Sequence, residues 1–156
     1  MKKLSGLVAA AVMLLVLVSG CGGSSRASAS DYRAQLETIA KESDAAQHAV
    51  GKGFQATSVP QLVKVLGVFG AAEKRIGDEV AALKPPKDAE SANTELAKGQ
   101  HDTASEVQAV IPKVKKLPSA KAAIAVLSKT PTTMGGREVD QALAMLKKLG
   151  YIKKVS

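Results

Sequence analysis

The sequence predicts an all-α protein, a small helical bundle of three longer amphipathic helices followed by a short C-terminal helical pair. Apolar residues recur every three or four positions along most of the chain, and no stretch shows the alternation typical of a half-buried strand. Ser, Pro and Gly stand at the places where helices are expected to begin and end. The 156 residues are 46% hydrophobic and only 3% aromatic, so we expect a folded domain whose seams are rich in Ala and Val.

Residues 1–20 have the organisation of a secretory signal peptide. Two lysines form a basic start, an uncharged apolar run extends over residues 4–18, and two small residues follow it. The apolar run is short for a membrane span, which requires about 20 residues. The sequence therefore predicts an exported protein from which residues 1–20 are removed.

The segment Val18-Ser19-Gly20-Cys21 resembles the lipobox of bacterial lipoproteins, which is an aliphatic residue, two small residues and a Cys. The resemblance implies that Cys21, the only Cys of the chain, carries a diacylglyceryl thioether and becomes the first residue after cleavage. Two or three acyl chains bind a bilayer far more firmly than one, because each buried methylene contributes ~0.8 kcal/mol. The chain is thereby expected to be a lipoprotein of the cell membrane, anchored at its extracytoplasmic face through the acyl chains on Cys21.

Two long helices are predicted after this segment. Residues 21–30 are expected to be the lipidated Cys and a flexible tether, with the helical domain at residues 31–156. Ser30 is the expected N-cap of the first helix. Ser58 and Gln61, with Pro60 between them, form a capping-box pattern that predicts the start of the second. The expected buried stripes are Tyr32, Leu36, Ile39, Ala46, Val50 and Phe54 in the first helix, and Leu62, Leu66, Phe69, Ala72, Ile76, Val80 and Leu83 in the second.

Pro85 and Pro86 should end the second helix, and three further helices are predicted after them. The third begins near Asp88, and Pro112 is expected to kink or end it. A short Ala-rich helix follows with Ser119 as its N-cap, and Gly150 suits the left-handed position after the last helix. The expected buried stripes are Ala89, Ala92, Leu96, Thr103, Val107, Val110 and Val114 in the third helix, thin around Gly99, and Val139, Leu143, Leu146 and Leu149 in the last.

The two-helix unit joined through Leu-Lys-Pro-Pro at residues 83–86 is similar to that of small Ala-rich helical lipoproteins of actinobacteria. The likeness covers about half of the chain that follows the signal peptide. It implies a helical fold and carries no activity with it.

No enzyme is predicted. The only Cys is assigned to lipid, and no G-x-S-x-G segment is present. His48 and His101 are the only histidines, and they fall on helix faces that do not obviously converge, so neither a metal nor a cofactor is expected. The scarcity of aromatic residues also argues against a surface that stacks sugars or bases.

Charge is unevenly distributed along the chain. Residues 21–111 carry ten basic and twelve acidic side chains, whereas residues 112–156 carry ten basic and two acidic ones. This basic third is interpreted either as a solvated surface or as a docking surface for anionic lipid, wall polymer or an acidic envelope protein. Nucleic acid is not an expected partner outside the membrane. The residues expected to contact an anionic surface are Lys113, Lys115, Lys116, Lys147, Lys148, Lys153 and Lys154.

Because the predicted tether is short, the basic third is expected to face the anchoring membrane. The leading expectation for function is a structural or interaction role without catalysis. The alternative is a small-ligand or metal carrier that uses the interior of the bundle. A seam filled by Ala, Val and Leu would favour the first function, and a pocket lined by several aromatic residues and convergent polar groups would favour the second.

Overall fold

A computed structural model describes residues 25–53, 55–129 and 134–152, and within these ranges it contains helices and connecting turns but no strand. The helices are α1 (Ala29–Gly53), α2 (Val59–Ala82), α3 (Glu90–Val114), α4 (Ala120–Leu127) and α5 (Met134–Lys148), and a 3₁₀ turn at Lys87–Ala89 precedes α3. The predicted all-α class is confirmed. Among these helices none is both long enough and apolar enough to cross a membrane.

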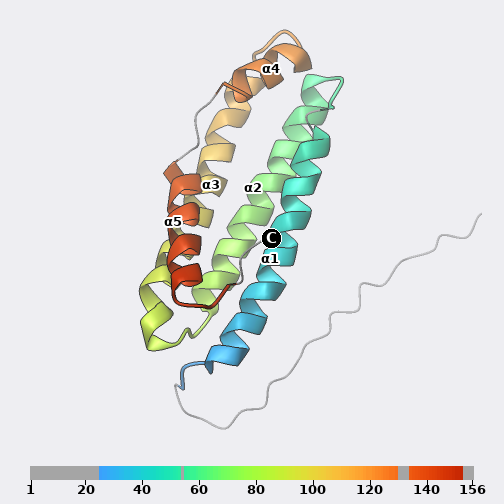
Figure 1. The fold of residues 1–156 in the computed structure, drawn as a ribbon. Coiled ribbons are helices and arrows are strands. Elements are labelled where there is room, and N and C mark those ends of the chain that lie inside the picture. Colours follow the sequence, from blue (N-terminus) through green and yellow to red (C-terminus); the bar gives the residue numbers. More distant parts are fainter. Residues whose placement is uncertain (1–24, 54, 130–133, 153–156) are drawn as a thin grey trace, which may run out of the picture.

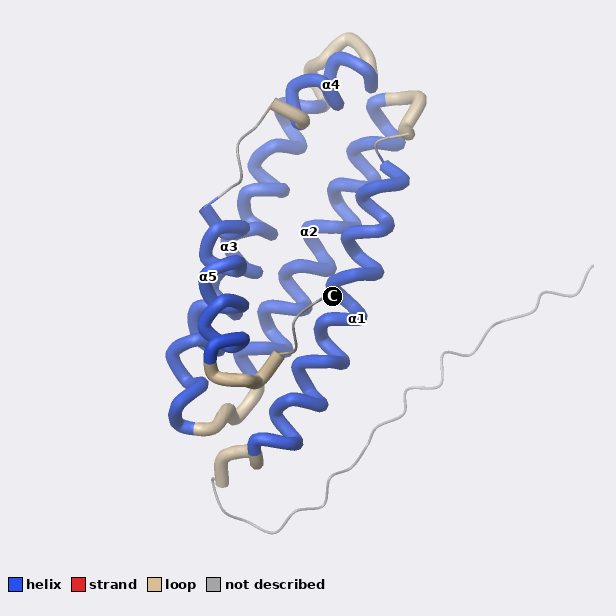
Figure 2. Tube along the Cα trace, in the orientation of Figure 1, coloured by secondary structure: helices blue, strands red, loops and turns tan. Residues whose placement is uncertain are grey.

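The three longest helices run up, down and up, with α2 packed against both α1 and α3 (Figures 1 and 2). Helix α5 lies antiparallel along the first half of α3, whereas α4 lies across the opposite end of the bundle and contacts α2. The arrangement is a bundle, as predicted, but α4 and α5 do not form a packed pair. We call the end with the start of α1, the α2–α3 connection and the end of α5 the proximal end, and the end with α4 the distal end.

Local sequence signals place several helix ends as predicted. The side-chain oxygens of Ser58 and Ser119 each accept a hydrogen bond from the backbone amide three residues later, at 3.4 and 3.2 Å. Gly150 has a φ of +79°, which is the left-handed conformation expected after the last helix. The amide of Tyr151 then donates to the carbonyl of Leu146 at 2.9 Å, as in a Schellman motif.

Three details of the helix ends differ from the predictions. Helix α1 begins at Ala29, and Ser28 replaces Ser30 as its cap by accepting a hydrogen bond from the amide of Asp31 at 3.2 Å. The side chain of Gln61 accepts from the amide of Thr57, so only half of the capping box at the start of α2 forms. Helix α3 continues through Pro112 to Val114, because a proline in the last turn removes only one helical hydrogen bond.

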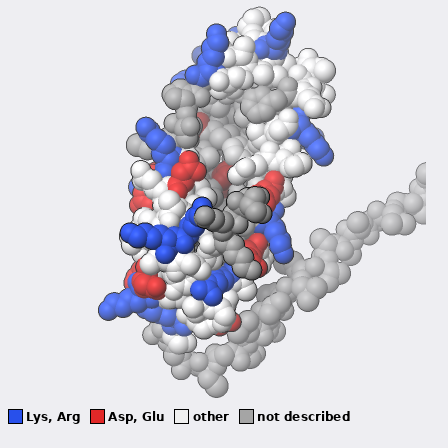
Figure 3. All heavy atoms as spheres, viewed as in Figure 1, with Lys and Arg blue, Asp and Glu red and all other residues white. Residues whose placement is uncertain are grey.

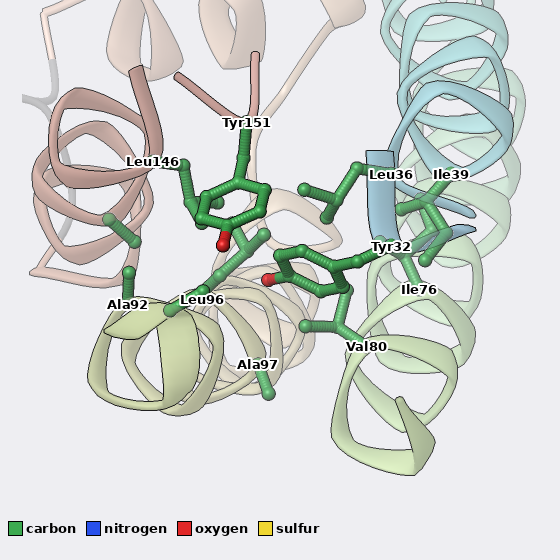
Figure 4. Close-up of a cluster of buried hydrophobic side chains, with 12 residues drawn as sticks. Tyr32, Leu36, Ile39, Ile76, Val80, Ala92, Leu96, Ala97, Leu146 and Tyr151 are labelled. Atoms are coloured by element: carbon green, nitrogen blue, oxygen red, sulfur yellow. The ribbon is translucent and has the colours of Figure 1, made fainter. Parts of the chain in front are cut away.

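Most of the buried apolar residues belong to two clusters that share no residue. The distal cluster consists of Leu62, Leu66, Val114 and Ala123. The proximal cluster, drawn in Figure 4, consists of Tyr32, Leu36, Ile39, Ile76, Val80, Ala89, Ala92, Leu96, Ala97, Ala142, Leu146 and Tyr151. Along α2 and α3, the buried polar residues Glu73 and Gln100 fall between the residues of the two clusters.

A tyrosine pair joins four segments of the proximal end. The rings of Tyr32 and Tyr151 meet edge to face with their centroids 5.2 Å apart (Figure 4). The hydroxyl of Tyr32 donates to Asn93 Oδ1 at 3.0 Å, and Asn93 Nδ2 donates to the carbonyl of Val80 at 2.9 Å. These bonds satisfy the buried amide of Asn93 while they tie α1, α2 and α3 together.

Helices α3 and α5 approach each other through two glycines. A Cβ atom added to Gly99 would lie 2.8 Å from the backbone nitrogen of Val139 and 2.9 Å from the carbonyl oxygen of Gly135. The part of the predicted α3 stripe around Gly99, where apolar side chains are few, is therefore the place where α5 packs. This close approach turns Ala142 and Leu146 inward and leaves Leu143 and Leu149 37% and 39% exposed, so the prediction that both leucines are buried is wrong.

Candidate functional site

The structure separates the lysines that the sequence analysis grouped into one surface. Lys113 lies in the last turn of α3, and Lys115 and Lys116 follow it at the distal end. Lys147 and Lys148 lie in the last turn of α5, at the proximal end. A helix of the length of α3 rises about 36 Å, so these two groups face opposite ends of the bundle. Lys153 and Lys154 lie outside the described residues.

The fold brings two segments without any Asp or Glu together at the distal end. Residues 45–72 supply the end of α1 and the first half of α2, and residues 107–129 supply the end of α3 and all of α4. Figure 3 shows Lys and Arg without neighbouring acidic residues on the visible face of this end. We call the following seven exposed lysines of the two segments the lysine pole: Lys52, Lys64, Lys113, Lys115, Lys116, Lys121 and Lys129.

Sequence reasoning missed two of the seven lysines of this pole. Lys52 and Lys64 belong to a part of the chain whose net charge is negative, so a count along the sequence hides them. The signal that identifies them is the absence of acidic residues from residues 45–72. The absence of acidic residues there produces a basic surface only because this segment lies beside residues 107–129 in the folded structure.

Elsewhere on the described surface, some basic side chains are paired with acidic ones, whereas Lys41, Lys84, Lys87, Arg137, Lys147 and Lys148 form no ion pair with a described residue. Arg26 contacts Glu90 at 2.9 Å at the proximal end. In the middle of the bundle, Arg75 contacts a carboxylate of α1 and one of α2, and Lys98 bridges α3 to α5. None of the ion pairs found within the described ranges includes a lysine of the pole. Ion pairs with described residues therefore do not neutralise the charge of the pole.

An open hollow of about 540 Å³ lies within the lysine pole, between the α1–α2 connection and the start of α4. Residues 55–57 line one side of it, and residues 119–121 with Ile124 line the other. Lys121 is the only charged residue in this lining. The side-chain oxygen of Ser119 already caps α4. The hollow is thus a depression in the exposed surface of the pole and is too open to enclose a ligand.

The two histidines lie on different helices, and only His48 falls within the two segments that form the lysine pole. His48 is exposed on α1, and His101 is half-buried on α3, with its Nε2 3.0 Å from Asp78 Oδ1. Within the described residues, no group of three or more His, Cys, Asp and Glu side chains is arranged to hold a metal ion.

The chain enters the bundle at the end opposite the lysine pole. The amide of Ala27 donates to the carbonyl of Lys84 at 2.7 Å, and Arg26 pairs with Glu90. Both contacts fix residues of the predicted tether to the proximal end, so fewer than nine residues are left to act as a flexible tether. The predicted signal peptide and Cys21 lie outside the described residues.

No protein-family model, curated protein or solved structure matches the chain. The likeness of residues 18–21 and 83–86 to lipoproteins therefore stays a prediction from the sequence.

Proposed function

We propose that this chain is a lipid-anchored envelope protein of the extracytoplasmic face that uses its lysine pole to bind an anionic envelope polymer and catalyses no reaction. The observation that carries the proposal is that the entry of the chain and the lysine pole lie at opposite ends of the bundle. The segment that leads to Cys21 leaves the proximal end, while the lysines of the two segments that lack Asp and Glu gather at the distal end. In this proposal, the scaffold of three longer helices holds the pole away from the anchor, and the two shorter C-terminal helices brace its two ends.

The length of the bundle decides which anionic surface the pole meets. Electrostatic attraction between exposed charges is largely screened beyond a Debye length, about 8 Å at physiological ionic strength. When the bundle stands on its anchored end, the pole lies roughly 36 Å outward, about four Debye lengths away from the leaflet. The pole then faces outward, toward a polymer that carries phosphate or carboxylate groups. This replaces the expectation that the whole basic third faces the anchoring membrane.

The form of the pole also suits a polymer. Its lysines are exposed on four segments, and the hollow among them is open. Flexible ammonium groups spread over a convex end attract a series of negative charges without fixing any single one in place. A binding surface of this kind has low selectivity for covalent structure and a strong dependence on salt.

The pole is tested with the full-length protein in neutral phosphatidylcholine vesicles and polyphosphate as the probe. In a distal variant, Lys113, Lys115, Lys116 and Lys121 become Gln; in a matched proximal variant, Lys84, Lys87, Lys147 and Lys148 become Gln. Both variants lose four positive charges, so a general effect of net charge affects them equally. We expect co-sedimentation with polyphosphate to fall at least tenfold in the distal variant only, and to disappear near 0.5 M salt. Equal losses in the two variants, or no binding by the unchanged protein at low salt, would contradict the proposal.

The anchor is tested separately through Cys21. Changing Cys21 to Ser should abolish acyl labelling and leave a protein that is uncleaved or released from membranes. Mass spectrometry of the mature membrane form provides the direct check. An intact and unmodified Cys21 in that form would defeat the assignment.

A further inference from the structure

Two buried polar side chains in the middle of the bundle have no hydrogen bond to any described residue. Glu73 on α2 is 3% exposed and Gln100 on α3 is 6% exposed. The third buried polar residue, Asn93, differs from them because both ends of its amide are hydrogen-bonded. A buried carboxyl without a partner is costly to maintain, so it requires an explanation.

The contacts of two glycines locate Glu73 between α2 and α3. A Cβ atom added to Gly70 would lie 3.2 Å from Val107, and one added to Gly77 would meet the ring of His101. Glu73 lies between these two points on α2, so it is level with the middle of α3, near Gln100. Ile76, one turn toward the proximal end, belongs to the proximal cluster. The two polar residues therefore form a layer between the two apolar clusters.

On the distal side of this layer, the apolar residues of the neighbouring helices are less fully buried than those on the proximal side. Helix α5 covers only the proximal half of α3, and α2 lies between α1 and α3 above it (Figure 2). The apolar residues that flank α2 in this half are only partly buried, namely Ala46 and Val50 on α1 and Val107 and Val110 on α3. The residues on the distal side of the layer are thus apolar, while the layer itself is polar.

We propose that Glu73 and Gln100 form an interior site for a small organic cation, a primary ammonium compound with a short apolar body. The carboxylate of Glu73 and the amide oxygen of Gln100 would accept hydrogen bonds from the ammonium group. The apolar body would lie against the partly buried valines of α1 and α3. The site is independent of the anchor and of the lysine pole, and it gives the small-ligand alternative a definite place in the fold.

The cationic side chains near Glu73 in the described part of the chain are already paired with other carboxylates. On α2, Lys74 pairs with Asp78, and Arg75 pairs with Glu79 and with Glu42 of α1. On α3, His101 is bonded to Asp78, and Lys98 pairs with Asp102 and with Glu138 of α5. In each of these pairs at least one side chain is more than half exposed.

Burial alone raises the pKa of Glu73 to about 7. An ammonium ligand favours the ionised carboxyl, so its binding should tighten up to tenfold per pH unit between pH 5 and 7 and level off above pH 7.

The probe is butylammonium, titrated at pH 8 into the full-length protein in micelles of an uncharged detergent. Binding is followed by the side-chain amide resonances of Gln100 and by the melting temperature from circular dichroism. Glu73→Gln removes the charge at nearly constant volume, and Glu37→Gln, at an exposed position of α1, is the matched control. We expect butylammonium to bind the unchanged protein and the Glu37→Gln variant equally, and the Glu73→Gln variant at least tenfold more weakly.

Neutral 1-butanol and anionic butyrate complete the test. Equal shifts with 1-butanol and butylammonium would mean that only the apolar residues bind the ligand. Equal binding of butylammonium by the Glu73→Gln variant and the unchanged protein would mean that the carboxylate is not part of the site. Either result would overturn the proposal. Binding that emerges only after Lys153 and Lys154 are replaced by Gln would identify the end of the chain as the partner of Glu73. That result would also overturn it.

Discussion

The buried carboxyl of Glu73 predicts that the protein becomes less stable as the pH rises from 4.5 to 7. Burial raises the pKa of Glu73 from its ordinary value of 4.5 to about 7, so the folded state binds the proton more tightly than the unfolded chain does. Below pH 4.5 the group is protonated in both states and costs nothing. Between pH 4.5 and pH 7 the folded protein holds a proton on Glu73 that the unfolded chain has released, so folding requires proton uptake and becomes less favourable as the pH rises. Above pH 7 the group is ionised in both states, and folding carries the full cost of burying the charge.

The magnitude follows from the difference between the two pKa values, about 2.5 pH units. At about 1.4 kcal/mol for each unit, ionisation of Glu73 lowers the free energy of unfolding by about 3 kcal/mol at pH 8. Glutamine resembles the protonated form in shape and carries no charge. Glu73→Gln should therefore leave stability nearly unchanged at pH 4 and raise it by about 3 kcal/mol at pH 8. For a domain with a total of 5–15 kcal/mol, such a gain is large.

Urea unfolding followed by circular dichroism at 222 nm, from pH 4 to pH 8, measures this difference. Other carboxyl groups also titrate in this range, so the quantity to compare is the gap between the variant and the unchanged protein at each pH. Glu37→Gln, on the exposed face of α1, should show a gap near zero throughout. A constant gap for Glu73→Gln across the whole range, or one that shrinks as the pH rises, would refute the reasoning.

Three further changes test the packing and the helix ends by urea unfolding. Gly135→Ala should lower the free energy of unfolding by about 1–3 kcal/mol, because the added Cβ would lie 2.7 Å from the carbonyl oxygen of Gly99. Gly51→Ala, where the added Cβ meets no atom within 4 Å, should be neutral or stabilise by up to about 1 kcal/mol. Equal effects of the two changes would contradict the close approach of α3 and α5. Tyr32→Phe should cost about 1–3 kcal/mol, since it leaves the buried oxygen of Asn93 without its donor, and an unchanged midpoint would show that water replaces the hydroxyl. Ser28→Ala should cost about 1 kcal/mol and Ser30→Ala much less, and the reverse order would restore Ser30 as the cap of α1.

The sequence by itself determined the helical class and several helix ends. Ser58, Ser119 and Gly150 act through hydrogen bonds or backbone conformations that involve only the next few residues, so their roles can be recognised without a tertiary structure. Part of the apolar stripes of α1 and α2 was predictable for a similar reason, namely Tyr32, Leu36 and Ile39 of α1 and Leu62, Leu66, Ile76 and Val80 of α2. The other predicted members are only partly buried, and Phe54 lies outside the described residues. Helical periodicity indicates which residues share a face, and the most apolar face is buried when it is wide enough.

Only the tertiary structure decided which residues of α5 face the core and which charges gather into a site. Gly99 and Gly135 allow two backbones to meet, and that contact rotates α5 so that Ala142 is buried and Leu143 is not. Glu73 is buried because α2 has neighbours on both sides, a property of the bundle and not of its own helix. The lysine pole exists because the chain folds residues 45–72 against residues 107–129. Periodicity describes one helix at a time, whereas burial and charge density depend on segments that are distant in sequence and adjacent in space.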